Sequence, residues 1–369
     1  MHIYDYIIIG SGLTGLTIAQ RLSAETKNVL VLESLDEVGG SNKPTSFAGQ
    51  IINNGLRFYP ATESSLSALK NLEHQLGIQL IKSVEENNPE TYEASGFKQF
   101  VGFGDKSPKF YDQFSYFLSP KFVQLECEPA QWIKTLKESF LGTLQTRSFV
   151  TKLGFEDLES KHPKLTHVIV NGKQTIHGHN FIFAAPLKEL TQILPDEIMS
   201  ARLKSKLGKA KSWQAVCVDL FHPESHQEKS NLFVLNGTTD DDIGPCIGKF
   251  ISSNISQWLS YVDVELAEDT ENIGNVLKKV KRQMKRAFPE IAERIQKERI
   301  FVSPPISGGD LKLNANLTYP HMENLWVASA TSATRPNLLG SLQTAQMITS
   351  ALGFETTANK ATESAQEML

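Results

Sequence analysis

Three glycines near the start of the chain have the spacing needed to hold a cofactor that carries phosphate. Gly10, Gly12 and Gly15 form the pattern G-x-G-x-x-G. In this pattern the first glycine permits a tight turn, the second lets the backbone approach a pyrophosphate, and the third allows a helix to pack closely on a strand. Glu33 follows Gly15 by 18 residues and is placed to accept hydrogen bonds from a ribose 2′-hydroxyl. The pattern therefore predicts a dinucleotide site.

The glycine turn needs a strand before it and a helix after it, and the sequence predicts both. Residues 4–9 form an apolar, β-branched run that is typical of a buried parallel strand. Residues 16–24 have helical spacing, and the N-terminus of this helix would offer free amides and the positive end of its dipole to phosphates. Residues 29–32 form a second apolar strand, which ends at Glu33. A merely structural glycine turn is the alternative, but the complete order of elements favours the dinucleotide site.

Residues 33–40 extend the pattern with an acid, a short spacer and the pair Gly39-Gly40. From this segment on, the chain resembles the flavin-containing amine oxidase superfamily, which includes monoamine oxidases, protoporphyrinogen oxidase and phytoene desaturases. The resemblance implies FAD rather than NAD as the cofactor. It also implies an α/β fold, in which a Rossmann-like FAD-binding domain of the GR2 type carries an inserted α+β substrate domain built on an antiparallel sheet. Covalent members of the family use a cysteine near the last strand–helix turn, and residues 329–340 contain none, so the FAD is expected to be non-covalent.

Further landmarks of the family follow in the right order along the chain. Residues 51–60 resemble the strand and turn beside the isoalloxazine ring, residues 148–150 the strand that meets the adenine, and residues 179–186 the strand that returns to the FAD domain. Residues 324–331 and 340–345 resemble the final strand and helix start, whose amides face the flavin N1/O2 edge. The cofactor-binding residues implied by the resemblance are Gly10, Gly12, Leu13, Thr14, Gly15, Glu33, Ser34, Gly39, Gly40, Ser41, Gly55, Leu56, Arg57, Val150, Ala184, Ser329, Ala330, Gly340, Ser341 and Leu342.

Two departures from the family pattern concern the same cofactor. The family commonly has Gly-Gly-Arg, whereas Gly40 is followed here by Ser41, so the arginine that would approach the phosphates is missing. The closing strand of the family usually ends in Ala-Gly and then a polar or acidic residue, whereas Ser329 stands here in place of the glycine. Thr331 or Ser332 could supply a hydroxyl instead. The departures imply weaker FAD binding or compensation by other groups.

The resemblance divides the chain into two domains and a tail. The expected segments are 1–77, 129–194 and 305–354 for the discontinuous FAD-binding domain, 78–128 and 195–304 for the substrate domain, and 355–369 for a polar C-terminal tail. Within the substrate domain, residues 213–221 alternate with a period of two and predict a strand, with sheet neighbours at 247–251 and 258–264. Aromatic residues are frequent in the segment 78–128, and we expect two or three of them to contact substrate and the rest to pack in the core.

Arg57 and Arg335 are the candidate catalytic residues. By resemblance both lie on loops adjoining the flavin, where an arginine could bind a substrate carboxylate with two hydrogen bonds or stabilise an anionic reduced flavin. The alternative for each is a surface ion pair or a contact with the FAD pyrophosphate. Many amine oxidases of the family place a lysine near flavin N5. Lys209 and Lys211 are close to that position in the sequence, but Trp213 or Gln214 matches it better. Residues 334–339 lack the aromatic ring of the family's amine cage, so simple monoamine oxidase activity is not expected.

Composition excludes several other classes of function. The formal net charge is −4, whereas a partner made of nucleic acid requires clustered Lys and Arg. The basic run at 278–286 has apolar residues on one helical face and predicts a solvated amphipathic helix, with a patch for a membrane surface or an anionic partner as the alternative. The three cysteines have no metal-ligand spacing, which predicts a reduced, cytoplasmic protein without a metal site. No apolar run approaches about twenty residues, and the first strand begins close to Met1, so we expect neither a transmembrane segment nor a leader.

These observations lead to one hypothesis of function and two alternatives. The chain is expected to be an FAD-dependent oxidoreductase that oxidises a C–N or C–C bond of a small-molecule substrate by hydride transfer to flavin N5, with dioxygen or another acceptor taking the electrons. One alternative is a redox-neutral flavoenzyme similar to sugar-nucleotide mutases, which requires arginines in the pocket for a pyrophosphate. The other is a non-catalytic or maturation partner that retains the flavoprotein fold and binds a protein, and the two departures support it.

Overall fold

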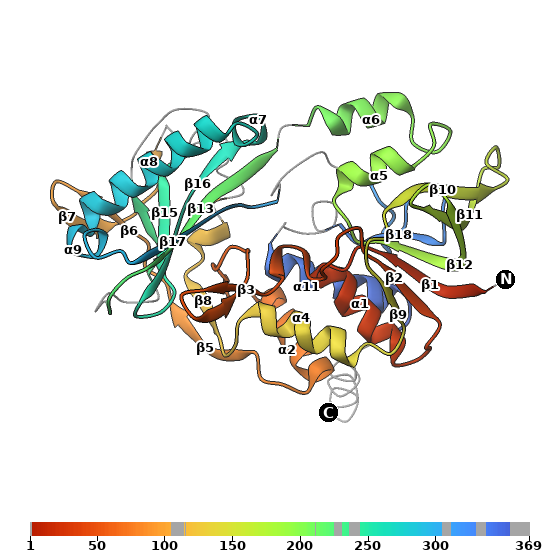
Figure 1. Ribbon diagram of the computed structural model, residues 1–369, viewed down its shortest axis with the longest axis horizontal. Coiled ribbons are helices and arrows are strands. Elements are labelled where there is room, and N and C mark those ends of the chain that lie inside the picture. Colours follow the sequence, from red (N-terminus) through yellow and green to blue (C-terminus); the bar gives the residue numbers. More distant parts are fainter. Residues whose placement is uncertain are drawn as a thin grey trace, which may run out of the picture.

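The computed structural model contains two large sheets that lie at opposite ends of the molecule, each covered by helices (Figure 1). It describes residues 2–104, 114, 116–210, 212–224, 231–235, 244–304, 311–329 and 337–354. The N-terminus lies beside the first sheet, and the long helix α8 covers the second (Figure 1). The elements of these two parts alternate along the chain.

The first sheet contains the parallel strands predicted around the glycine turn. β1 pairs in parallel with β2 on one side and with β12 on the other, and β9 and β18 extend the parallel part. β10 and β11 add an antiparallel part beside β12. The strands are β1 (Ile3–Ile9), β2 (Val29–Leu32), β9 (Thr143–Gln145), β10 (Val150–Glu156), β11 (Lys164–Val170), β12 (Gln174–Phe183) and β18 (Leu325–Val327).

Alternate residues of β1 reach opposite faces of this sheet, and helices cover both faces. Ile7 and Ile9 pack in the core cluster that includes Leu190 of α5, whereas Ile8 packs with Ile18 of α1 and Ile348 of α11. Because both faces are covered, β1 and β2 are nearly continuous apolar runs. The helices around this sheet are α1 (Leu13–Ser23), α2 (Glu63–Leu76), α4 (Pro129–Ser139), α5 (Leu187–Ile193), α6 (Ala201–Gly208) and α11 (Leu338–Ala351).

The second sheet has the strand order β17-β13-β16-β15-β14-β6-β7 and is antiparallel except where β14 meets β6. This confirms the predicted strand at residues 213–221 and its two neighbours. The strands are β6 (Glu90–Glu93), β7 (Gly96–Gln99), β13 (Trp213–Phe221), β14 (Phe233–Leu235), β15 (Cys246–Phe250), β16 (Ile255–Asp263) and β17 (Lys297–Val302).

The two faces of the second sheet have different covers. On the outer face, Val218 and Trp258 pack against Val280 and Met284 of α8 (Thr270–Ala287). The predicted basic helix is therefore amphipathic, and its apolar side is buried on the sheet. The inner face faces the first sheet and packs against aromatic side chains such as Phe122.

Shorter elements complete the fold. They are β3 (Thr45–Phe47), β4 (Gln50–Ile52), β5 (Ile81–Glu86), β8 (Lys121–Leu125), α7 (Val264–Ala267), α9 (Pro289–Ala292) and the 3-10 turns η1 (Gly40–Asn42) and η3 (Tyr116–Leu118). β3 pairs with β4 and β5 pairs with β8, each in a separate two-stranded sheet. The fold class predicted from the sequence is confirmed, whereas the exact domain boundaries stay a prediction. Across the described ranges, no helix combines the length and the apolar character needed to cross a membrane.

Candidate functional site

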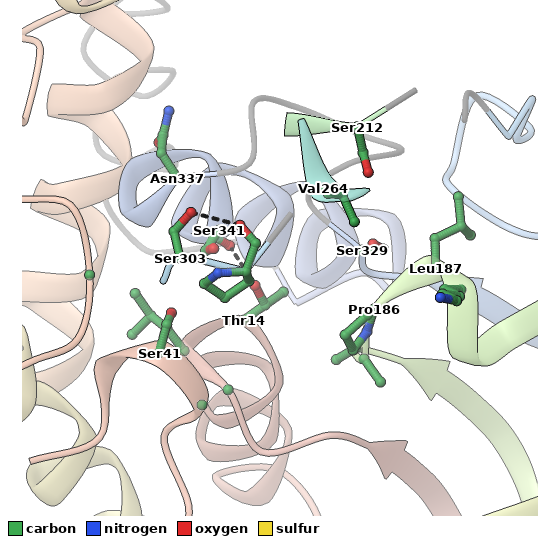
Figure 2. A pocket seen from close by; sticks show the side chains of 18 of the residues that line it. Thr14, Ser41, Pro186, Leu187, Ser212, Val264, Ser303, Ser329, Asn337 and Ser341 are labelled. Carbon is green, nitrogen blue, oxygen red and sulfur yellow. Dashed lines mark hydrogen bonds between the residues drawn. The ribbon is translucent and has the colours of Figure 1, made fainter. Parts of the chain in front are cut away.

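A cavity of about 830 Å³ lies at the carboxyl end of β1, a volume typical of sites for small molecules and cofactors. One wall comes from the glycine turn, the segment 39–42 and the residues after β12. The other comes from the second sheet and its connections, including Ser212, Val264 and Ser303 (Figure 2). The two parts of the molecule therefore share one cavity.

The three glycines of the turn have different surroundings. A Cβ on Gly10, whose φ is +103°, would lie 2.8 Å from the carbonyl oxygen of Ala184, and a Cβ on Gly15 would lie 2.1 Å from that of Gly10. A Cβ on Gly12 would meet no described atom within 4 Å, and Gly12 lines the cavity. Gly10 and Gly15 are thus required by the turn and by helix packing, whereas the space beside Gly12 is open to a ligand.

The N-terminus of α1 points to the same space. Its N-cap is Gly12, which has no side chain that could accept from the first amides, and Leu13 and Thr14 line the cavity. Thr14 Oγ1 donates a hydrogen bond of 3.3 Å to the carbonyl oxygen of Ser341, which ties α1 to α11 (Figure 2). Amides without a side-chain cap and the positive end of the dipole suit a phosphate group.

The Gly39-Gly40 pair folds back onto the glycine turn. The Gly39 amide donates a 2.9 Å hydrogen bond to the Ser11 carbonyl oxygen. The φ angles of Gly39 and Gly40 are +109° and +55°, values that residues with a Cβ rarely adopt. The turn η1 begins at Gly40 and brings Ser41, for which an arginine was expected by resemblance, to the cavity wall.

Glu33 ends β2 as predicted, but neighbouring groups occupy its carboxylate. Oε2 accepts hydrogen bonds from the amide and the hydroxyl of Ser11, and Oε1 accepts from the Leu35 amide at 2.9 Å and the Ser34 hydroxyl at 3.3 Å. These four bonds use the acceptor capacity of a carboxylate, so a ribose hydroxyl would have to replace one of them. Neither Glu33 nor Ser34 is among the residues that line the cavity.

The strands expected at the two ends of the cofactor lie near this acid and near the turn. The Ser148 amide donates a 2.7 Å hydrogen bond to the Glu33 carbonyl oxygen, which places Val150 at the start of β10 close to Glu33. Val150 is buried in the core and does not line the cavity. Ala184 does line it and is held by its amide, which donates to the Ile9 carbonyl oxygen at 2.8 Å.

The final strand leads to the cavity as predicted. β18 is followed by Ala328 and Ser329, and both line the cavity. The Ala328 amide donates to the Phe183 carbonyl oxygen at 2.7 Å, which fixes this end against β12. Ala330 and Arg335, as well as Thr331, Ser332 and Lys211, lie outside the described residues.

The last helix begins two residues earlier than the predicted start at Gly340. Asn337 is its N-cap, and its side-chain oxygen accepts a 2.8 Å hydrogen bond from the Gly340 amide. This cap extends the helix to Leu338, and it uses an amide that was expected to face the cofactor. Ser341 lines the cavity, whereas Gly340 and Leu342 are buried away from it.

Arg57 has a different position from the one predicted. Gly55 and Leu56 line the cavity, but Arg57 is not among the lining residues. Its buried guanidinium lies with Nη2 3.6 Å from Oδ2 of Asp219 and donates to the Asn53 carbonyl oxygen at 3.3 Å. Arg57 therefore belongs to a buried ion pair with Asp219, which differs from the surface ion pair given as the alternative, and its catalytic role stays a prediction.

A buried acid lies in the electrostatic surroundings of Arg57. Burial raises the pKa of Glu128, and the guanidinium of Arg57 opposes this rise. Burial also raises the pKa of Tyr59 well above its usual value, and the charge of Glu128 adds to this effect. Titration of these groups is thus coupled to the charge of Arg57.

Sequence reasoning missed most of the wall contributed by the second sheet. Asp263, Val264 and Glu265 at the start of α7 line the cavity, and so does Glu268. Lys209, a candidate from the sequence, lines it as well. The missed residues come from loops and strand ends, where no local motif marks a contact.

The aromatic residues of segment 78–128 serve the core. Phe100, Phe114, Phe117 and Phe122 are buried in one cluster with the inner face of the second sheet. None of the described aromatic residues of this segment lines the cavity. The described part of the chain therefore favours core packing over the predicted contact with substrate. Among the described residues there is also no group of side chains that could hold a metal ion.

Comparisons with known proteins agree with this geometry. Residues 8–76 match the family model of the NAD(P)-binding Rossmann-like domain. The flavin-containing amine oxidase A of Equus caballus is 49% identical over 39 residues, which is 11% of this chain. This match spans only 7% of the length of that relative.

Several solved structures share the fold over nearly the whole chain. Cyclohexylamine oxidase from Brevibacterium oxydans IH-35A has a TM-score of 0.66 and 14% identity, and the match covers 96% of this chain and 99% of that chain. A putative protoporphyrinogen oxidase from Exiguobacterium sp. 255-15 has a TM-score of 0.64 and 11% identity, with 96% and 100% covered. An oxidoreductase from Methanosarcina mazei has a TM-score of 0.64 and 13% identity, with 94% and 100% covered. The resemblance stated from the sequence is confirmed at the level of the fold.

Proposed function

We propose that this chain is an FAD-dependent oxidoreductase that oxidises a C–N or C–C bond of a small molecule by hydride transfer to flavin N5. The observation that carries this proposal is the composition of the cavity. The open space beside Gly12 and the wall around Val264 belong to one cavity of about 830 Å³, so a cofactor and a substrate could meet in it.

The residues of the first wall fit a dinucleotide. Gly12 leaves room for close approach, and the amides that follow it at the N-terminus of α1 would bind the pyrophosphate. Glu33 would bind the ribose after exchanging one of its present hydrogen bonds. Gly55, Leu56 and Ser329 would lie along the rest of the cofactor.

The residues of the second wall would serve the substrate. When bound, FAD would supply a two-electron acceptor. The chain itself would contribute position and desolvation, because Val264, Pro304 and Leu207 would exclude water from the reacting bond. Lys209 and Asp263 would orient polar groups of the substrate from the same wall.

The two alternatives receive different support from the site. A sugar-nucleotide mutase requires arginines that bind a pyrophosphate, and no arginine is among the described residues that line the cavity. A non-catalytic partner is favoured by Ser41 at the arginine position and by the Gly340 amide, which the Asn337 side chain already uses. Weak or absent binding of FAD would be the consequence of that second alternative.

Purification of the full chain and an absorbance spectrum test the proposal. We expect the bands of oxidised flavin, release of FAD on denaturation, and bleaching by dithionite and by a substrate amine or reduced hydrocarbon under anaerobic conditions. Titration with NAD and NADP in parallel distinguishes the proposed cofactor from the nicotinamide cofactors. A colourless protein that takes up no added FAD would contradict the proposal and leave the partner hypothesis in first place.

A further inference from the structure

Three polar side chains that contact one another form a row across the inner face of the second sheet, and Lys249 of β15, which stands next to Gln257 in the register, lies over the Phe122 ring instead. Arg299 on β17, Asp219 on β13 and Gln257 on β16 stand opposite one another in the register of the strands. The neighbouring row on the same face is apolar and consists of Phe301, Cys217 and Leu259. Asp219 and Gln257 are fully buried. Buried polar groups require partners, so the contacts of this row identify what it is for.

The first partner of the row is the backbone that follows β4. Arg299 Nη2 donates to the carbonyl oxygen of Asn53 at 2.6 Å, and Nη1 donates to the side-chain oxygen of Asn54 at 2.8 Å. Nε of the same guanidinium donates to Oδ2 of Asp219 at 3.0 Å, and Nη2 is also paired with this carboxylate. One guanidinium thus joins the sheet to two consecutive residues of the segment.

Gln257 continues these contacts along the same segment. Its side-chain oxygen accepts from the Arg57 amide at 2.8 Å, and its Nε2 donates to the carbonyl oxygen of Gly55 at 3.2 Å. Nε2 also donates to Oδ1 of Asp219 at 2.9 Å. Asp219 therefore orients Arg299 with one oxygen and Gln257 with the other, and it lies 3.6 Å from the guanidinium of Arg57.

The segment held in this way is part of the cavity wall. Asn54, Gly55 and Leu56 all line the cavity, whereas Asp219, Gln257 and Arg299 do not. The row contacts the segment from behind, on the side away from the cavity. Its geometry is that of a support for the wall.

We infer that Asp219, with Arg299 and Gln257, is a positioning device that fixes residues 53–57 and so sets the wall of the cavity at Gly55 and Leu56. The inference rests on the proposed function insofar as that wall contacts the flavin. None of the three is a catalytic residue, because none lines the cavity. Asp219 is the centre of the device, since both of its oxygens are used and two guanidinium groups share its charge.

Asp219→Asn tests the inference by removing the charge while keeping the shape of the side chain. Hydrogen exchange is measured by mass spectrometry on a peptide that contains residues 53–58, in the protein without added flavin. We expect exchange in this peptide to become about tenfold faster or more, because local opening of the segment is no longer opposed. FAD affinity is expected to fall by about tenfold in the same variant.

Glu298→Gln is the matched control. Glu298 neighbours Arg299 on β17, but it pairs with Lys281 of α8 on the outer face. This variant also removes one carboxylate, so it reproduces the change in net charge. Exchange of the peptide 53–58 and FAD affinity are expected to stay at the values of the unchanged protein.

Arg299→Lys covers the case in which Asp219→Asn does not fold. Arg299 lies on the edge strand β17 and is partly exposed, so the sheet tolerates the change. A lysine keeps the charge, but it cannot donate to Asp219, Asn53 and Asn54 with the geometry of a guanidinium. Faster exchange at 53–58 with unchanged exchange in β15 supports the inference.

The outcomes separate the inference from the proposed function. Unchanged exchange at 53–58 in Asp219→Asn or in Arg299→Lys overturns the inference, whether or not FAD binds. Faster exchange in a protein that binds no FAD supports the positioning of the segment and contradicts only the proposed function. Faster exchange with equal FAD affinity overturns the part of the inference that links the segment to the cofactor.

Discussion

Two parts of the cavity wall, one at Gly12 and one at Gly55, are built in opposite ways. The wall at Gly12 is made by residues that lie close together in the sequence, and its shape follows from glycine conformations and the start of one helix. The wall at Gly55 is held by Asp219, Gln257 and Arg299, which are separated from the segment by up to 246 residues. A wall shaped by the backbone therefore follows from a local motif, whereas a wall supported by side chains requires the complete fold.

The largest expected effect concerns the local wall. In Gly15→Ala the new Cβ would lie 2.1 Å from the Gly10 carbonyl oxygen, so α1 has to move away from β1. We expect the free energy of unfolding to fall by about 3 kcal/mol or more, measured by denaturant titration. Gly12→Ala in the same turn is the control and should retain stability. Equal losses in both variants would show that the two glycines do not have separate roles.

The second prediction concerns a buried charge of the second sheet that does not contact the cavity wall. Lys249 of β15 is buried, and its ammonium lies 4.3 Å from the centre of the Phe122 ring. Burial lowers the pKa of Lys249 from 10.5 to about 8. The buried ammonium is desolvated, and it does not hold segment 53–57 in place. We therefore expect Lys249→Met to raise the free energy of unfolding at pH 7 by about 1 to 3 kcal/mol.

The sign of the pH dependence follows from the lowered pKa. Between pH 8 and pH 10.5 the unfolded chain retains the proton on Lys249 and the folded chain has lost it. The contribution of Lys249 to the free energy of unfolding therefore rises with pH between pH 8 and pH 10.5. The difference in free energy of unfolding between the unchanged protein and Lys249→Met should shrink over the same range. A difference in the free energy of unfolding that stays constant with pH would contradict the lowered pKa of Lys249.

The smallest expected effect concerns the start of α11, which also lines the cavity. Asn337→Ala removes the side chain that accepts from the Gly340 amide, which should cost about 1 kcal/mol of stability. Ser200→Ala removes the N-cap of α6 and should have a similar cost. FAD affinity should change in Asn337→Ala alone, since Asn337 lines the cavity and Ser200 does not. Equal affinities would exclude Asn337 from the site.

Much of the local wall could be predicted from the sequence. The strand–glycine turn–helix order predicts β1 and α1, and the Gly39-Gly40 pair of the pattern has the positive φ angles that favour glycine. The helix α11 starts two residues before the predicted Gly340, because the Asn337 side chain caps it. These features depend on neighbours within a few residues, which is the range that a pattern can report.

The supported wall could not be predicted in the same way. The period of two along β13 places Asp219 on the same face as Cys217. A carboxylate on that face indicates a buried polar contact, but it does not identify the partner. Its partners Arg299 and Gln257 depend on the register of three strands, which the sequence alone does not define. The position of Arg57 along the chain predicts that it lies beside the cofactor. The direction of its side chain depends on Asp219, which is far away in the sequence.

The most direct test of the cavity as an FAD site compares Gly12→Ala with Gly274→Ala. Both glycines have open space at the position of a new Cβ, but only Gly12 lines the cavity, whereas Gly274 lies in α8. FAD binding is measured by quenching of flavin fluorescence, with the unfolding transition recorded for each variant. The account predicts one FAD per chain, a loss of affinity of about tenfold or more in Gly12→Ala at unchanged stability, and no loss in Gly274→Ala. Equal affinity in the two variants, or no uptake of FAD by the unchanged protein, would contradict it.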